Sequence, residues 1–177
     1  IRSDWPDRQC RLYAPGQDSG TFDYFTETVN GDSGNCRPDA TFSEDDNVLV
    51  TGVAGDPDGI GFFGFAYFHE NRSQLNIVAI DGGKGAIEPT SQTIEDGSYA
   101  PLSRPLFIYV AKAAKAKPQV DAFVRFYLDN MQDLAGQVGY IGLPDAVCDL
   151  IRKRYEQGIT GTIGGKKGTL IDIYGQS

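Results

Sequence analysis

The chain has 177 residues, of which 40% are hydrophobic and 23% charged, enough to bury one good core and part of a second. Its net charge of −8, with Lys and Arg scattered rather than gathered in a stripe, argues against nucleic-acid binding. No run approaches the roughly 20 apolar residues that a membrane-spanning helix needs, and no basic-then-apolar segment opens the chain as a signal peptide would. An anionic ligand is not excluded, because charges beyond a Debye length of roughly 8–10 Å are screened while local donors hold a buried oxyanion.

The first elements of the chain are predicted to be a strand, a polar turn and a helix. Residues 11–14 are short and apolar enough for a buried strand, and a Pro-Gly pair ends it. Three apolar residues then recur at helical spacing, namely Phe22, Phe25 and Val29. A helix is therefore expected to begin at Ser19 or Gly20.

The start of this helix has the donors that an oxyanion needs. Its first backbone N–H groups have no partner within the helix and carry the positive end of the helix dipole. Ser19 and Thr21 add two hydroxyl groups, and Gly20 lacks the Cβ that would keep an anion away from the backbone. For the tripeptide alone, an ordinary Ser or Asp helix cap is the alternative explanation.

Strand-like and helix-like segments alternate along the rest of the chain. We expect a loop over 31–42, a helix start at 43–46 with a short helix to 53, a strand at 59–63, a helix at 65–71 and a strand at 74–80. After these elements we expect a turn-rich stretch with a short helix near Ser91 and a long apolar strand at 104–111. The rest of the chain shows helical patterns from Pro118 and over 144–157, a spacer at 164–168 and an apolar end at 170–174. This order predicts an α/β fold, a sheet flanked by helices, with ligands at strand carboxyl ends such as the turn after Ala14.

The three cysteines do not have the spacing of metal ligands, and His69 is the single histidine, so a structural metal site is not expected. Cys10 precedes the first strand and Cys36 follows the first helix, so the return of the chain could bring them together as a disulfide, which suits an exported protein. Three unpaired thiols are the alternative.

Four segments in order resemble the phosphate-binding proteins that serve ABC importers, especially their SphX-like branch. The first is the run Ala14-Pro15-Gly16-Gln17-Asp18-Ser19-Gly20-Thr21-Phe22-Asp23-Tyr24-Phe25, which resembles the Ser-Gly-Thr anion loop of that family. The later segments are Ser43–Asn47, Gly59–Gly64 and Tyr99–Val110. Four ordered matches between residues 14 and 110 are more specific than one.

The resemblance implies a lobe of the type II periplasmic-binding-protein fold, with a mixed sheet flanked by helices. Residues 1–117 would be the second ligand-binding lobe, and residues 118–177 the C-terminal helices and tail returning toward a first lobe, so that the chain is a fragment or a processed product. The implied function is extracytoplasmic binding of inorganic phosphate for delivery to ABC permease subunits, by a monomer that is not an enzyme, is exported to the periplasm or cell surface, and uses no cofactor.

The resemblance assigns site residues by position. Ser19, Gly20 and Thr21 match the anion loop, but the arginine that many relatives have four residues before the serine is replaced by Pro15. Arg104 is the candidate replacement, since a guanidinium can hold two oxygens of an anion; an ion pair with Asp45 or Asp46 is the alternative. Asp18 could accept a hydrogen from a protonated phosphate oxygen, or it could cap the helix or orient Arg104.

Other functions remain open from the sequence. Sulfate or arsenate could replace phosphate, and a sensor or interaction domain could have kept only the fold. A serine hydrolase using Ser33 or Ser19 is a further alternative, since residues 31–34 resemble the nucleophile motif of chymotrypsin-like proteases. That chemistry needs a histidine base, which in that family precedes the serine in the chain, whereas His69 follows it. A Gly-Asp-Ser-Gly turn therefore explains the motif better. Residues 164–169 suggest a phosphate loop but fail its spacing.

Overall fold

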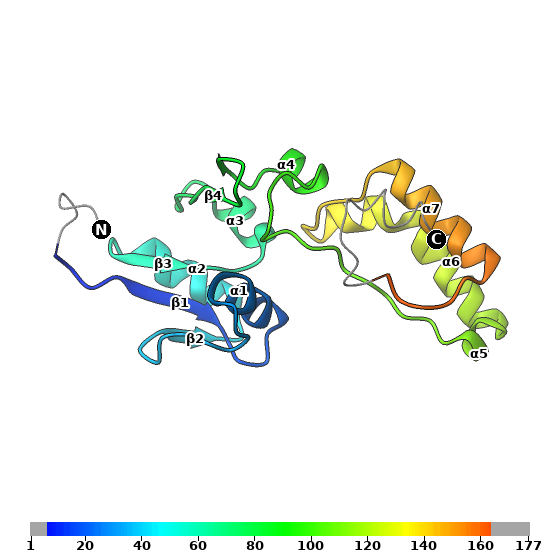
Figure 1. The fold of residues 1–177 in the computed structure, drawn as a ribbon, viewed down its shortest axis with the longest axis horizontal. Coiled ribbons are helices and arrows are strands. Elements are labelled where there is room, and N and C mark those ends of the chain that lie inside the picture. The colour runs from blue at the N-terminus through cyan, green and yellow to red at the C-terminus, as the bar shows by residue number, and fades with distance from the viewer. Residues whose placement is uncertain (1–6, 164–177) are drawn as a thin grey trace. The chain divides into compact units, whose positions relative to one another are not determined.

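The computed structural model describes residues 7–163, which form two compact units that divide after Val78 (Figure 1). Within this range, no helix combines the length and the apolar character that crossing a bilayer requires. Each unit is described by itself below.

The first unit is a parallel sheet whose strands are joined by helices. Strand β1 (Arg11–Pro15) lies between β2 (Thr41–Ser43) and β3 (Gly59–Gly61), as Figure 1 shows. Tyr13 pairs with Thr41 on one side and with Gly61 on the other. The connections are helices α1 (Gly20–Asn30) and α2 (Asp46–Gly55), and α3 (Phe65–Asn71) follows β3. Alternation of parallel strands and helices confirms the α/β class.

Apolar residues from β1, α1 and α2 make the core of the first unit. Ala14 and Leu49 are fully buried, and Phe22 and Val50 nearly so. The one buried polar side chain in the described part of the chain is Thr26, whose hydroxyl donates to the Phe22 carbonyl at 2.8 Å. The same hydroxyl oxygen accepts from the Gly34 N–H at 2.8 Å, so the loop after α1 is held against the helix.

The second unit begins with a short antiparallel hairpin and ends in a helical hairpin. Strands β4 (Ile80–Asp81) and β5 (Ala86–Ile87) pair, and α4 (Ser91–Glu95) follows with a Thr90 capping box. The helices are α5 (Lys112–Lys115), α6 (Pro118–Gln137) and α7 (Asp145–Gln157).

Packing between α6 and α7 is apolar at its centre and polar at its edges. Val124 and Leu128 of α6, and Val147 and Cys148 of α7, are buried. At the edge, the Tyr155 hydroxyl of α7 donates to Asp121 of α6 at 3.0 Å. Several large apolar side chains of α6 stay exposed, Phe123 at 65% and Phe126 at 59% among them.

Most predicted elements of the chain are confirmed, and three local predictions are wrong. The predicted loop over 31–42 contains part of β2, because a three-residue strand gives too short a pattern to recognise. The predicted strand at 74–80 contributes only Ile80, and the predicted strand at 104–111 does not form. Its apolar residues are solvent-exposed instead, with Leu106 at 65% and Tyr109 at 79%, since a strand also needs a neighbouring strand to pair with. The predictions over 164–168, 164–169 and 170–174 lie outside the described residues.

Candidate functional site

The predicted anion loop lies at the carboxyl end of β1, as expected. The Gly16 N–H donates to the Ser43 carbonyl at 2.9 Å, which holds the end of β1 to the end of β2. The Ser19 N–H then donates to the Gly16 carbonyl at 3.0 Å, so residues 16–19 form a tight turn. This turn delivers the chain directly into α1, whose N-cap is Ser19.

Ser19 caps the helix through its side chain. Its backbone is extended, with φ −84° and ψ 124°, and its Oγ accepts a hydrogen bond from the Thr21 N–H at 3.2 Å. A serine oxygen that accepts in this way still carries its own hydroxyl hydrogen, which it can donate outward. Capping and anion binding by Ser19 are therefore compatible, and the cap is Ser19 rather than Asp18.

The residues at the start of α1 are partly accessible to solvent, although the Ser19 and Thr21 N–H groups already donate within the loop. Gly20 and Asp18 are exposed, while Ser19 and Thr21 are partly buried. The Ser19 and Thr21 side chains are therefore not fully enclosed by the fold. The geometry suits a small anion approaching along the helix axis.

An acidic side chain that the sequence did not suggest lies beside this loop. A Cβ added to Gly16 would overlap the carboxylate of Glu44, so that carboxylate lies directly against the Gly16 backbone. Glu44 follows β2, and recognising its position would have required the β1–β2 pairing. Nearby, burial and then the charges of Asp45 and Glu44 raise the pKa of the Asp46 carboxyl.

The negative charge of the chain is concentrated in this half. Residues 1–78 contain 13 acidic and 5 basic side chains, so the whole net charge of −8 lies there, and residues 79–177 are neutral with 11 of each. The formal charge of residues 1–78 therefore disfavours anions wherever solvent and salt do not screen it.

Arg104 belongs to the second unit, in the irregular stretch after the turn at residues 99–102. Beside it, the Ser103 hydroxyl donates to the Tyr99 carbonyl at 2.6 Å, which fixes the start of this stretch. The role of Arg104 as a ligand stays a prediction, as does its alternative role as a partner of Asp45 or Asp46.

The structure also shows the surroundings of the residues on which the hydrolase and disulfide predictions rest. The Ser33 hydroxyl donates to the Asp23 carboxylate at 2.9 Å, an interaction that orients the loop and does not activate a nucleophile. His69 lies in α3, with its ring 5.9 Å from that of Phe65. Cys10, Cys36 and Cys148 are all free thiols, so the Cys10–Cys36 disulfide stays a prediction.

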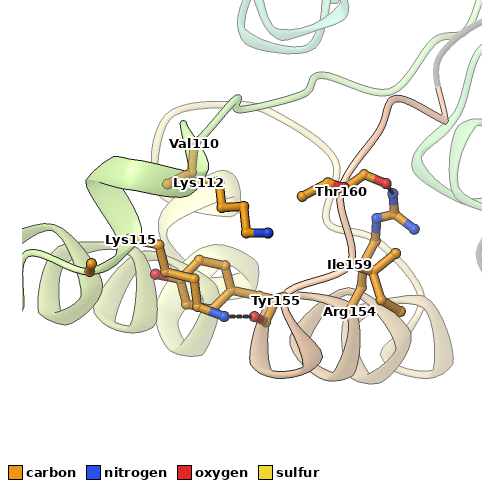
Figure 2. Close-up of a pocket in the computed structure, with 9 residues that line it drawn as sticks. Val110, Lys112, Lys115, Arg154, Tyr155, Ile159 and Thr160 are labelled. Carbon is orange, nitrogen blue, oxygen red and sulfur yellow. Dashed lines mark hydrogen bonds between the residues drawn. The ribbon is translucent and has the colours of Figure 1, made fainter.

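A cavity of about 390 Å³ lies at the C-terminal end of α7, and none of the predicted site residues is in its lining. The lining residues are Val110, Lys112, Lys115, Ala116, Arg154, Tyr155, Gly158, Ile159 and Thr160. Figure 2 shows Lys115 directed at the end of α7, where its ammonium donates to the Tyr155 carbonyl. Arg154 donates to the Gly161 carbonyl at 2.8 Å. We therefore interpret Lys115 as a cap of the last carbonyls of α7, whereas Arg154 holds the chain that follows the helix.

Comparison with known families and proteins agrees with the geometry. Residues 3–130 match a family model described as a PBP superfamily domain. The chain is 44% identical to Protein SphX from Synechocystis sp. over 171 residues, which cover 96% of this chain and 51% of that protein. It is 38% identical to the phosphate-binding protein PstS from Staphylococcus haemolyticus over 147 residues, 82% of this chain and 45% of that protein. The chain thus spans about half the length of these curated relatives.

Solved structures match as well. One, described as a possible phosphate binding protein from Planctomyces limnophilus, matches with a TM-score of 0.77 and 43% identity over 90% of this chain and 57% of that chain. PstS from Borrelia burgdorferi matches with a TM-score of 0.56 at 20% identity, over 78% of this chain and 55% of that chain, which shows a shared fold alone. Since the family model covers more than half of the sequence, the chain belongs to the PBP superfamily, and it is similar within it to the SphX and PstS proteins.

Proposed function

We propose that the chain binds inorganic phosphate outside the cytoplasm and that the protein to which it belongs delivers the anion to the permease of an ABC importer. The observation that carries this proposal is the helix start at the carboxyl end of β1, where the hydroxyls of Ser19 and Thr21 and the backbone of Gly20 lie at the positive end of the α1 dipole. The Ser19 and Thr21 N–H groups already donate within the loop, to the Gly16 carbonyl and to Ser19 Oγ, so the two hydroxyls are the proposed donors to the anion. The similarity to proteins named for phosphate binding supports phosphate as the anion. Sulfate and arsenate have the same tetrahedral shape and are the rival ligands.

The lobe assignment is part of the same proposal. Residues 1–117 would form the second lobe of a two-lobed binding protein, and residues 118–177 would return toward the first lobe. The chain covers about half of its relatives, and the segment Leu106–Tyr109, which belongs to no helix or strand among the described residues, exposes apolar side chains. Both observations are what a lobe separated from its neighbour would show. In this assignment, Arg104 and Asp18 join the anion loop as ligands, and the monomer is the working unit.

Calorimetric titration of a chain that carries both lobes, with phosphate and with sulfate at equal ionic strength, tests the proposed function. We expect heat from phosphate and little from sulfate, because a carboxylate such as Asp18 can accept a hydrogen from protonated phosphate and has none to accept from sulfate. Equal affinities would assign the site to tetrahedral oxyanions in general. A serine-directed phosphonate that labels Ser33 or Ser19 would instead favour the hydrolase.

Arg104→Ala tests the counter-charge in the same titration. If Arg104 replaces the arginine absent at Pro15, its removal leaves the anion without its main positive partner, and the affinity should fall at least as far as in Thr21→Ala. Lys84→Ala, which removes a cation from the exposed loop between β4 and β5, is the matched control and should leave the affinity unchanged. If Arg104→Ala leaves the affinity for phosphate unchanged, the positive partner of the anion must be another residue.

A further inference from the structure

We propose that Cys10 and Cys36 are a redox-active pair that forms a disulfide and so links the two segments at the amino ends of strands β1 and β2. The inference concerns a different edge of the first unit from the anion loop and does not depend on the proposed function. It is carried by the arrangement of the two segments that contain these cysteines.

The two cysteines lie at the amino ends of neighbouring parallel strands. Cys10 directly precedes β1, and Cys36 lies in the connection that leads into β2. Tyr13 of β1 pairs with Thr41 of β2. Cys10 lies three residues before Tyr13, and Cys36 lies five residues before Thr41. Parallel strands lie about 4.8 Å apart, so segments that enter them side by side come within reach of one another.

A carboxylate joins the two segments. Asp39 accepts from the Gln9 amide at 2.9 Å and from Arg37 at 2.7 and 2.9 Å. Gln9 and Arg37 are the sequence neighbours of Cys10 and Cys36. The side chains on one flank of each cysteine thus meet on the same carboxylate, which brings the two segments together before any covalent bond forms.

The position of Cys36 is also fixed from its other flank. Two residues before it, the Gly34 N–H donates to the buried Thr26 hydroxyl at 2.8 Å. Asp39 is the main cause of the raised pKa of Arg37, and smaller contributions of the same sign come from Cys10 and Cys36, as expected if both sulfurs lie near its guanidinium. This second observation agrees with the backbone argument.

Noncovalent contacts at this edge are weak on their own. The Arg37 and Asp39 side chains are each 48% exposed, and solvent screens an ion pair of that exposure. A covalent link between Cys10 and Cys36 would close a ring containing β1, the anion loop and α1. Such a ring removes conformational entropy from the unfolded chain and so stabilises the first unit.

Oxidation of the two cysteine thiols needs an oxidant, and a small disulfide such as glutathione disulfide can serve. The thiolate of Cys10, which is exposed, attacks one sulfur of glutathione disulfide and expels a glutathione thiolate. The thiolate of Cys36 then attacks the Cys10 sulfur of this mixed disulfide and expels the second glutathione. Two protein thiols are oxidised, one disulfide is reduced to two thiols, and the two protein protons pass to the glutathione thiolates.

Cys148 provides an internal control. It is 1% exposed in α7, and its burial raises the pKa of its thiol, so less of the reactive thiolate forms. It also lies in the second unit. A pairing driven by the geometry of the β1–β2 edge should leave Cys148 reduced.

Peptide mapping of the 177-residue chain after equilibration with glutathione disulfide tests the pairing. Trypsin cuts after Arg8 and Arg11 but not between Arg37 and Pro38, so Cys10 and Cys36 fall in separate peptides, 9–11 and 12–72. We expect these peptides to be cross-linked, with Cys148 alkylated. Three alkylated cysteines, or a cross-link that involves Cys148, would overturn the proposal.

Thermal melting with and without reductant tests the stabilising role. Reduction should lower the melting temperature of the oxidised chain by roughly 10 °C, given a ring of this size. Cys10→Ser should lose this dependence on reductant, and Cys148→Ser should keep it. If the cross-link forms and the melting temperature does not change, the disulfide has no stabilising role and this part of the proposal is wrong.

Discussion

The Ser19 side chain combines two roles that substitution can separate. Its oxygen caps α1 by accepting from the Thr21 N–H, and its hydroxyl hydrogen is the proposed donor to phosphate. Alanine removes both roles, whereas glycine is tolerated as a helix cap at a cost of only a few tenths of a kcal/mol. The pair of substitutions therefore distinguishes the cap from the ligand.

We expect Ser19→Ala to lower the stability by about 1 kcal/mol and Ser19→Gly to lower it much less. Both should weaken phosphate binding by roughly 10- to 150-fold, since a hydrogen bond to a charged acceptor contributes about 1.5–3 kcal/mol. Thr21→Ala should weaken binding equally, and Gly20→Val more, because a branched side chain fills the space where the anion meets the backbone. Melting curves and calorimetry measure the two effects, and a Ser19→Gly variant with unchanged affinity would contradict the ligand role.

At the scale of elements, helix α2 contains two glycines with opposite surroundings. A Cβ on Gly52 would lie 2.6 Å from Cδ1 of Tyr13, a ring held in place by its hydroxyl bond to Asp56 at 3.0 Å. A Cβ on Gly55 would meet nothing within 4 Å. The first glycine is required by packing against β1, and the second is not.

Gly52→Ala should therefore lower the free energy of unfolding by about 1–3 kcal/mol through overpacking, while Gly55→Ala should leave it unchanged or raise it by up to about 1 kcal/mol. Denaturant titration of the two variants measures the difference. Equal stabilities would show that α2 does not pack on Tyr13 as described.

The contact between α6 and α7 predicts a dependence on pH. Arg125 first, and then the Tyr155 hydroxyl, lower the pKa of Asp121. A carboxyl with a lowered folded-state pKa stabilises the fold above its unfolded value of about 3.9, and this contribution is lost as the pH falls through the folded-state pKa. Tyr155→Phe should thus lower the melting temperature at pH 7, and the difference from the wild type should vanish in acid.

Tyr127→Phe is the matched control for this experiment, since Tyr127 lies on α6 at 38% exposure. It should show no difference that depends on pH. A Tyr155→Phe difference that persists unchanged below pH 3 would mean that the hydroxyl acts independently of the Asp121 charge.

Local signals explain which elements the sequence predicts correctly. Helix α1 begins where its serine cap predicts, and α2 begins at Asp46, within the helix start predicted over 43–46, with Asp45 as its cap. Strands depend on partners that the sequence does not show. The apolar run at 104–111 satisfies the pattern of a buried strand, yet within the described residues Leu106–Val110 belong to no sheet. The contact of Glu44 with Gly16 was missed for the same reason, because it follows from the pairing of β1 with β2.

At the scale of the whole molecule, the charge distribution and the length lead to one expectation. The half that carries the anion loop has a charge of −8, and the chain spans about half of its relatives. On the proposed lobe assignment, phosphate would meet the donors of one lobe without those of a second. The chain alone should bind phosphate weakly, in the millimolar range or worse, about −4 kcal/mol. A micromolar affinity would contradict the proposal that the chain is one lobe of a two-lobed site.

Amide chemical shifts during a phosphate titration test the central claim most directly, because they locate weak binding at single residues. The proposed site predicts that the amides of Ser19, Gly20 and Thr21 shift progressively and saturate in the millimolar range, with much smaller shifts in sulfate at equal ionic strength. Thr21→Ala should remove most of the response. Shifts confined to Lys112, Lys115 and Arg154 at the end of α7, or no shift at Ser19 to Thr21, would contradict the account.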